Sequence, residues 1–295
     1  MGLCRIKSID WKKRSLYGGA GSSVTVQKRR GMEPQKIFKA GVVQFDIING
    51  QIETNMELVF ATLGDLASQN VRLAVLPELF SCGFDNRHLK AHSRHTASIL
   101  ERLSGFARAH GMAIAGSLPE SANGQVYNTM YFVDTNGSVR ETYRKLHLFR
   151  LTNEHLFYGA GDKAVTIDTS LGRMGLMICY DLRFPELARK LFLAGAEMIL
   201  VSAQWPSPRK HHWHHLAVAR AIESQLYMVC ANRTGTDESL AFPGMSMIVD
   251  PLGEIIADAG AFNGTAVAPI EMERVAQARQ MIPCLTDRRA DIYGQ

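Results

Sequence analysis

Short apolar runs alternate with amphipathic stretches in the first half of the chain. The segment IFKAGVVQFDI at 37–47 is rich in β-branched and aromatic residues and predicts a strand. Apolar positions three and four residues apart predict a helix over 55–69, and the run at 72–76 predicts the next strand. Strand, helix and strand in this order are typical of a parallel βαβ unit.

The middle of the chain adds hairpins to this alternation. A helix is predicted over 95–110 and a strand over 112–117. The segments 126–133 and 139–143 flank Asn136-Gly137, a dipeptide that favours tight hairpin turns, so we expect them to pair antiparallel. The remaining predictions are strands over 164–167, 174–178, 198–202, 227–232, 245–249, 255–257 and 265–268, and helices over 184–194, over 213–225 and from Glu271.

The predicted strands are apolar enough to be covered on both faces, and parallel units are mixed with antiparallel hairpins. This combination predicts an α/β fold with two packed sheets and helices outside, a four-layer α/β/β/α sandwich. Residues 36–295 contain no linker-like stretch and are expected to form a single domain. Residues 1–35 are polar, basic and rich in Gly and Ser. They are predicted to be a disordered extension because they offer too little apolar surface to fold alone.

Composition and charge narrow the classes of function. The 295 residues are 46% hydrophobic and 21% charged, which is ordinary for a soluble globular protein. The formal charge is +5, but residues 1–31 hold eight Lys or Arg against one Asp, so residues 32–295 carry a net charge of −2. The positive charge is therefore local to the N-terminus. The body of the chain gives no electrostatic reason to expect nucleic acid or an anionic membrane surface as a partner.

Cysteine usage and the apolar runs bear on the location of the protein. The five cysteines are odd in number, widely spaced and free of CxxC pairs, which fits a reducing compartment. No apolar run reaches the roughly 18 residues of a membrane-spanning helix, and the first thirty residues lack the apolar core of a secretory signal. The basic N-terminal residues 1–31 have the composition of an organelle-targeting peptide but no clear amphipathic face. We therefore expect a cytoplasmic protein.

The stretch RMGLMICYDLRFPE at 173–186 ends an apolar strand at Cys179. Phe184-Pro185-Glu186 then opens a helical pattern, so Cys179 is expected at a strand-to-helix turn. The backbone N–H of Tyr180 and the positive end of the helix favour a thiolate at such a turn, with an oxyanion beside it. This position suits a nucleophile. The alternative reading of a lone cysteine is a small apolar residue that packs at a strand end.

Two charged residues also follow predicted strands. Glu78 comes after the apolar run that ends at Pro77, and Lys145 comes after the second hairpin arm. Taken singly, an acid or a lysine in such a place is usually a surface charge. Together with Cys179 they supply a base for the thiol, a donor for the oxyanion of an attacked amide and a proton for the departing amine.

These residues lie in motifs that resemble those of a known family. The segments PELF, YRKLHLF and ICYDLRFPE, which contain Glu78, Lys145 and Cys179, resemble the three active-site motifs of the nitrilase superfamily of carbon-nitrogen hydrolases. Three further segments resemble the omega-amidase branch of this superfamily: RAIESQLYMVCANRTG, DPLGEII and RQMIPCLTDRRADIY. The resemblance covers nearly the whole chain from Phe38 onward. It implies a sandwich of the nitrilase type that assembles as a homodimer.

The resemblance also implies roles within the site. Glu78 would be the general base and acid, Lys145 the cation that stabilises the oxyanion, and Cys179 the nucleophile that forms a thioester. A second glutamate of the family corresponds to Glu154, which would hydrogen-bond Lys145 or the substrate. The segment between Lys145 and Glu154 is shorter than in animal omega-amidases, which leaves the shape of the pocket wall open. No cofactor is implied.

An acidic substrate needs a cation at some distance from the sulfur atom. Arg209, close to Trp205-Pro206, is the candidate, because an arginine grips a carboxylate through two parallel hydrogen bonds. Trp205 is expected to contact the substrate as well. The alternative reading of Arg209 is an exposed loop residue. The histidines in the run HHWHH at 211–215 have no acid or cysteine nearby to complete a ligand set, so no metal site is expected there.

We therefore expect a cofactor-free amidase that releases ammonia from a small primary amide. An omega-amidase acting on 2-oxoglutaramate or 2-oxosuccinamate is the specific hypothesis. Hydrolases of deaminated glutathione, N-carbamoyl compounds or aliphatic amides are alternatives within the superfamily. An acyltransferase that passes its thioester to an amine, and a catalytically silent interaction module, are alternatives of other classes. The intact Glu78, Lys145 and Cys179 argue against silence.

Overall fold

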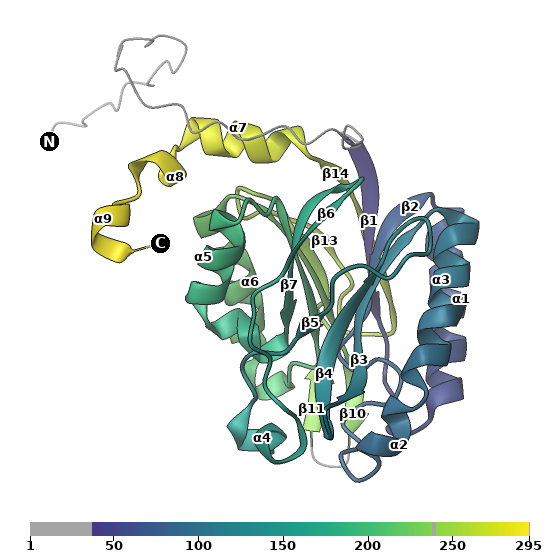
Figure 1. Ribbon diagram of the computed structural model, residues 1–295. Helices are drawn as coiled ribbons and strands as arrows, with labels where there is room; N and C mark the ends of the chain where they lie inside the picture. Colours follow the sequence, from purple (N-terminus) through teal and green to yellow (C-terminus); the bar gives the residue numbers. More distant parts are fainter. Residues whose placement is uncertain (1–36, 238–239, 295) are drawn as a thin grey trace, which may run out of the picture. The chain divides into compact units, whose positions relative to one another are not determined.

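Two six-stranded β-sheets lie at the centre of the computed structural model, which describes residues 37–237 and 240–294 (Figure 1). In spatial order the first sheet contains β14 (Gly264–Glu271), β1 (Ile37–Gln44), β2 (Val71–Val75), β3 (Ala113–Ala122), β4 (Gln125–Val133) and β5 (Tyr143–Arg144). The second contains β13 (Ile255–Asp258), β12 (Met247–Val249), β9 (Tyr227–Asn232), β8 (Met198–Ala203), β7 (Gly172–Ile178) and β6 (Thr166–Thr169).

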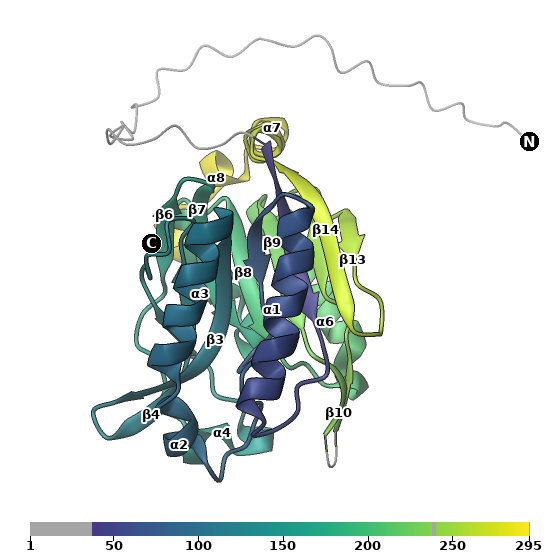
Figure 2. The same ribbon diagram turned by 90° about the vertical axis from the view of Figure 1, so that its right-hand side faces the viewer.

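Each sheet has three parallel strands at its centre and antiparallel strands at its sides. Strands β1, β2 and β3 are parallel in the first sheet, and β7, β8 and β9 are parallel in the second. Parallel neighbours require a crossover connection, and helices supply it here. The helices α1 (Ile52–Ser68) and α3 (Thr96–His110) cover the outer face of the first sheet, and α5 (Pro185–Leu193) and α6 (Lys210–Ser224) cover that of the second (Figures 1 and 2). The predicted four-layer α/β/β/α sandwich is confirmed.

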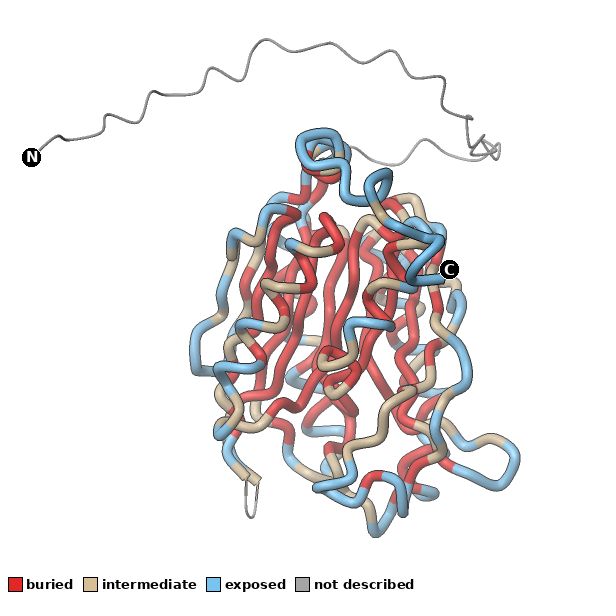
Figure 3. Tube along the Cα trace, turned by 90° about the vertical axis from the view of Figure 1, so that its left-hand side faces the viewer, coloured by how far each residue is buried: buried red, intermediate tan, exposed pale blue. Residues whose placement is uncertain are grey.

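The alternation of side chains along each strand explains why the layers form. In β1, Val42 belongs to the core between the two sheets, whereas the next residue, Val43, packs in the core beneath α1 and α3. Ala113 and Ile114 of β3 divide between the same two cores. Both faces of these strands are therefore apolar and buried, while the outer faces of the helices remain exposed (Figure 3). Burial on this scale is the main force that holds the layers together.

The predicted hairpin around Asn136-Gly137 is only partly present. Strand β4 pairs along its whole length with β3 across a turn at Asn123-Gly124, and β5 consists of two residues. Between Val133 and Val139 there is one isolated bridge. Asn123 and Gly124 both have positive φ angles, as a tight hairpin turn requires, and this turn sets the dominant pairing of β4.

Most other predicted elements are present with ends shifted by a few residues. The helix predicted over 213–225 begins at Lys210, and the strand predicted over 245–249 begins at Met247. Several other elements of three to five residues were not predicted, because their few positions show no clear period. They are α2 (Leu89–Ser93), α4 (Glu154–Phe157), α8 (Cys284–Asp287), α9 (Ala290–Tyr293), the two-stranded sheet of β10 (Thr234–Asp237) and β11 (Leu240–Pro243), and the 3₁₀ turns η1 (Arg150–Thr152), η2 (Cys179–Arg183) and η3 (Ser207–Arg209).

The end of the described chain is helical, with α7 (Glu273–Met281) leading into α8 and α9. The extension predicted over 1–35 lies outside the described residues, and the single domain over 36–295 stays a prediction. Across the described ranges, no helix combines the length and apolar character needed to cross a membrane.

Candidate active site

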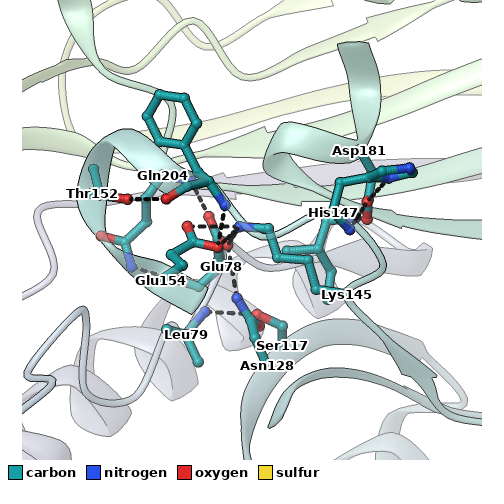
Figure 4. A network of polar contacts seen from close by, with 12 residues as sticks. Glu78, Leu79, Ser117, Asn128, Lys145, His147, Thr152, Glu154, Asp181 and Gln204 are labelled. Carbon is teal, nitrogen blue, oxygen red and sulfur yellow. Dashed lines mark hydrogen bonds and ion pairs between the residues drawn. The ribbon is translucent and has the colours of Figure 1, made fainter. Parts of the chain in front are cut away.

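The side chains of Glu78, Lys145 and Cys179 follow the ends of strands β2, β5 and β7. Glu78 lies three residues beyond Val75, whereas Lys145 and Cys179 follow their strands directly. The Nζ atom of Lys145 is 2.8 Å from Oε1 of Glu78 (Figure 4). Cys179 is near enough for its thiol and both charged groups to influence one another. Residues from both sheets therefore bring a thiol, a cation and a carboxylate together.

Glu78 is fully buried, and both of its oxygen atoms have fixed partners. Besides Lys145, Oε1 accepts a hydrogen bond of 2.8 Å from Asn128 Nδ2, and Oε2 accepts one of 3.0 Å from the backbone N–H of Gln204. The side-chain amide of Gln204 also donates to the carbonyl oxygen of Glu78 at 2.7 Å. These contacts hold the carboxylate in one orientation, as a group that transfers protons requires.

Lys145 lies between two carboxylates and has no exposed surface. Its Nζ atom is 2.9 Å from the carboxylate of Glu154, whose Oε2 atom also accepts the backbone N–H of Phe149 at 3.1 Å. Burial alone would lower the pKa of Lys145, but the charges of Glu154 and Glu78 outweigh it and hold this pKa well above its ordinary value. Burial raises the pKa of Glu154 against the opposing charge of Lys145. Lys145 therefore stays positively charged at neutral pH.

Cys179 begins the 3₁₀ turn η2 and has a φ of +45°, which a residue with a side chain rarely adopts. The predicted turn between strand and helix is thus present. The expected thiolate is not, because burial raises the pKa of Cys179 well above its ordinary value. The negative charge of Glu78 raises it further, and Lys145 lowers it only in part. The resting side chain is a thiol that must lose its proton as it attacks.

Asp181 connects the two segments that contain Lys145 and Cys179. Its Oδ2 atom accepts a hydrogen bond of 2.7 Å from the hydroxyl of Tyr143 and one of 3.0 Å from the backbone N–H of Ile178. Its Oδ1 atom lies 3.0 Å from the backbone nitrogen and 2.7 Å from Nδ1 of His147. These four contacts tie the end of β5 to the end of β7, and Figure 4 shows those between Asp181 and His147. They fix the cation and the thiol relative to each other.

These supporting residues were not predicted from the sequence. Asp181 and His147 each lie two residues after a predicted site residue, within the same motifs, and that spacing was a usable signal. Asn128 is one polar residue within the arm of a hairpin, and Gln204 follows a buried strand. Neither had a local pattern that set it apart.

A cavity of about 120 Å³ opens beside Cys179. Its lining includes the predicted residues Glu154, Tyr180, Trp205 and Arg209, together with Phe84, Phe149, Arg183 and Phe242. The role of the Tyr180 backbone N–H stays a prediction. Cavities of this kind, mostly apolar with a few polar groups, are typical of small-molecule sites.

Two guanidinium groups face this cavity. The group of Arg183 lies 4.6 Å from the ring of Trp205, and that of Arg209 lies 5.4 Å from the ring of Phe149. The indole N–H of Trp205 donates to the Arg209 carbonyl oxygen at 2.8 Å and orients the turn. Burial lowers the pKa of Arg183, and repulsion from Arg209 adds to this effect. Nη2 of Arg183 lies 3.2 Å from Nδ1 of His212, and both arginines line the same cavity as Cys179.

This chain is similar to known proteins both in sequence and in structure. A family model described as carbon-nitrogen hydrolase matches residues 39–280. A 2-oxoglutaramate amidase of Bacillus subtilis is 38% identical over 253 residues, which are 85% of this chain and 97% of the relative. The omega-amidase YafV of Escherichia coli K12 is 36% identical over 215 residues, 72% of this chain and 82% of the relative. The crystal structure of Saccharomyces cerevisiae Nit3, a member of branch 10 of the nitrilase superfamily, is similar with a TM-score of 0.79 and 28% identity, covering 87% of this chain and 98% of that one.

Proposed function

Because the chain belongs to the carbon-nitrogen hydrolase family, we propose that it is an omega-amidase, which releases the terminal amide of a small carboxylic acid as ammonia. As a family member it hydrolyses carbon–nitrogen bonds other than peptide bonds. The observation that carries the proposal is the position of Arg183 and Arg209, two guanidinium groups in the same cavity as Cys179. A thiol and a pair of cations in one small cavity suit a substrate with an amide at one end and a carboxylate at the other.

The first half of the reaction forms a thioester. The sulfur of Cys179 attacks the amide carbon while Glu78 takes the thiol proton. Negative charge develops on the carbonyl oxygen, and Lys145 and the backbone N–H of Tyr180 stabilise it. When the tetrahedral intermediate collapses, the carbon–nitrogen bond breaks, and Glu78 passes its proton to the departing nitrogen. Ammonia leaves, and the acyl group stays on Cys179.

The second half returns the enzyme to its resting state. Glu78, again ionised, takes a proton from a water molecule that attacks the thioester carbon. Lys145 stabilises the second oxyanion, the carbon–sulfur bond breaks and Cys179 recovers its proton. The raised pKa of the Cys179 thiol supports a mechanism of this kind, in which a fixed base is required in both halves. Glu154 holds Lys145 and stays outside the bond changes.

The specific substrates that we propose are 2-oxoglutaramate, which is named in the description of the Bacillus relative, and its shorter homologue 2-oxosuccinamate. The test is a panel of amides scored for released ammonia: the two oxo-acid amides, deaminated glutathione, an N-carbamoyl acid and neutral amides of matched length. The proposal requires the oxo-acid amides to have the highest kcat/KM. Preference for a neutral amide would favour an aliphatic amidase instead. Transfer of the acyl group to added hydroxylamine in preference to water would favour an acyltransferase.

Replacing Arg183 or Arg209 by alanine is expected to weaken turnover of the acidic substrate selectively. A charge-assisted hydrogen bond contributes about 1.5–3 kcal/mol, so each variant should lose about 10- to 150-fold in kcat/KM for 2-oxoglutaramate. A neutral amide of equal length should be hydrolysed at nearly the wild-type rate. Arg150→Ala is the matched control, because Arg150 is an exposed arginine of the neighbouring turn η1. Equal losses for the acidic and the neutral substrate would remove both arginines from carboxylate recognition.

We also propose a homodimer. The C-terminal segment supports it, because large apolar side chains there are exposed: Met281, Ile282, Leu285, Ile292 and Tyr293. Light scattering at micromolar concentration should give twice the chain mass. Deleting residues 282–295, which leaves α7 in place, should shift the protein toward the monomer. A monomeric full-length chain would contradict the proposal, and a dimeric deletion variant would place the interface elsewhere.

A further inference from the structure

Three side chains with metal-binding atoms converge in the segment that follows Glu78. Asp85 lies in the loop before α2, His88 is the residue that precedes this helix, and His92 lies within it. The two histidines are four residues apart, so both imidazoles lie on the same side of the short helix. None of these residues belongs to the thiol, cation and carboxylate group described above.

The distances show how closely the three groups approach. Oδ2 of Asp85 lies 2.9 Å from Nδ1 of His88 and 2.8 Å from Nε2 of His92. One potential ligand atom from each residue lies within 4.8 Å of the other two. The His92 side chain is 10% exposed and that of Asp85 20%, which limits their freedom, whereas His88 is 65% exposed. Two of the groups are thus held in place, and the third is reachable from solvent.

The donor set determines which ion fits. We propose that Asp85, His88 and His92 form a Zn²⁺ site of this protein. Two imidazoles and one carboxylate are a zinc-type set with three protein ligands, and Mg²⁺ or Ca²⁺ would require more oxygen atoms. With metal–ligand bonds of about 2.0–2.2 Å, tetrahedral ligands are roughly 3.4 Å apart. The two contacts to Asp85, at 2.9 and 2.8 Å, would therefore widen by about half an ångström when the ion binds.

A metal ion at this site would also affect the wall of the cavity that contains Cys179. Phe84 and Asn86, the residues on either side of Asp85, both line the cavity that contains Cys179. A metal bound at Asp85 would cross-link the loop to α2 and hold this part of the cavity wall. The ion would act as a structural clamp, separate from the reaction at the sulfur atom.

The test is a calorimetric titration of full-length protein with ZnCl₂, using Cys179→Ala as the background so that the active-site thiol binds no zinc. Asp85→Asn and His88→Gln are introduced singly, because His88 is exposed and its replacement leaves the core intact. The matched control is His211→Gln/His215→Gln, which removes another pair of histidines four residues apart, on α6. MgCl₂ titrations test the choice of ion.

One zinc ion per chain is expected to bind in the background protein and in the control. Losing a residue that hydrogen-bonds to a metal ligand already lowers metal affinity by about 10- to 100-fold. Losing a ligand itself should therefore lower zinc affinity by roughly 100-fold or more in Asp85→Asn and His88→Gln. Absence of zinc binding, binding that survives His88→Gln, or binding that disappears in the α6 control would each overturn the site. Equal affinity for Mg²⁺ would overturn the assignment to zinc.

Discussion

Replacing Cys179 by alanine is expected to abolish amide hydrolysis and leave the fold intact. Alanine removes the sulfur atom that forms the thioester, while the surrounding contacts of Glu78, Lys145 and Asp181 do not involve that atom. Loss of the nucleophile or its partner in a covalent hydrolase lowers kcat by about 10⁴- to 10⁶-fold. Ammonia release from 2-oxoglutaramate, measured beside the thermal midpoint, checks both parts of the prediction.

The other cysteines provide the control for this experiment. Cys284→Ala changes an exposed thiol and should keep full activity. Cys82 and Cys230 are buried, burial raises the pKa of Cys82 to about 12, and neither residue lines the cavity that contains Cys179. Mass spectrometry with a slow substrate should therefore show the acyl adduct on Cys179 alone. Comparable activity in Cys179→Ala, or an adduct on another cysteine, would contradict the assignment.

The positions of the candidate site residues were predictable because strands fix them. Glu78 and Cys179 follow buried runs whose apolar character is visible in the sequence, and a side chain just beyond such a run leaves the core on stiff backbone. The meeting of the three groups was not predictable from that pattern. Glu78 and Lys145 are 67 residues apart and follow β2 and β5 of the first sheet, whereas Cys179 follows β7 of the second. The family motifs supplied that link.

The supporting contacts depend on tertiary packing, which a local pattern does not encode. Asn128 reaches Glu78 because β3 and β4 pair across the turn at Asn123-Gly124, and that pairing differs from the predicted hairpin. The protonation state of Cys179 also depends on tertiary packing. The turn favours a thiolate locally, but burial next to the charge of Glu78 reverses the direction, and burial is a property of the whole fold.

Replacing Lys145 by methionine is expected to lower kcat by about 10²- to 10³-fold, the usual cost of removing one group that stabilises an oxyanion. The cation is needed mainly when negative charge develops, so KM should change far less than kcat. Steady-state kinetics with 2-oxoglutaramate separates the two effects. Normal kcat with a raised KM would move Lys145 from catalysis to substrate binding.

The same substitution should also destabilise the protein in a pH-dependent way. Methionine leaves the carboxylates of Glu78 and Glu154 buried without their shared cation, and breaking a buried ion pair in this manner costs about 3–5 kcal/mol. Burial already raises the pKa of Glu154, and Lys145 is the main influence that lowers it. Without Lys145 the folded protein binds protons at a pH where the unfolded chain has released them. The stability of the variant should therefore fall as pH rises above the ordinary pKa of glutamate.

In the wild type the contribution of Lys145 to stability does not change with pH near neutrality. Its raised pKa gives a stabilisation that is complete below the ordinary pKa of lysine and is lost only in strong alkali. The deficit in Tm of Lys145→Met relative to wild type should therefore be larger at about pH 8 than at about pH 5.5. Adding Glu154→Gln removes one of the two facing charges, so the double variant should recover stability at the higher pH but not the lost kcat. A deficit that does not change with pH, or a double variant that regains kcat, would show that Lys145 acts through something other than its charge between two carboxylates.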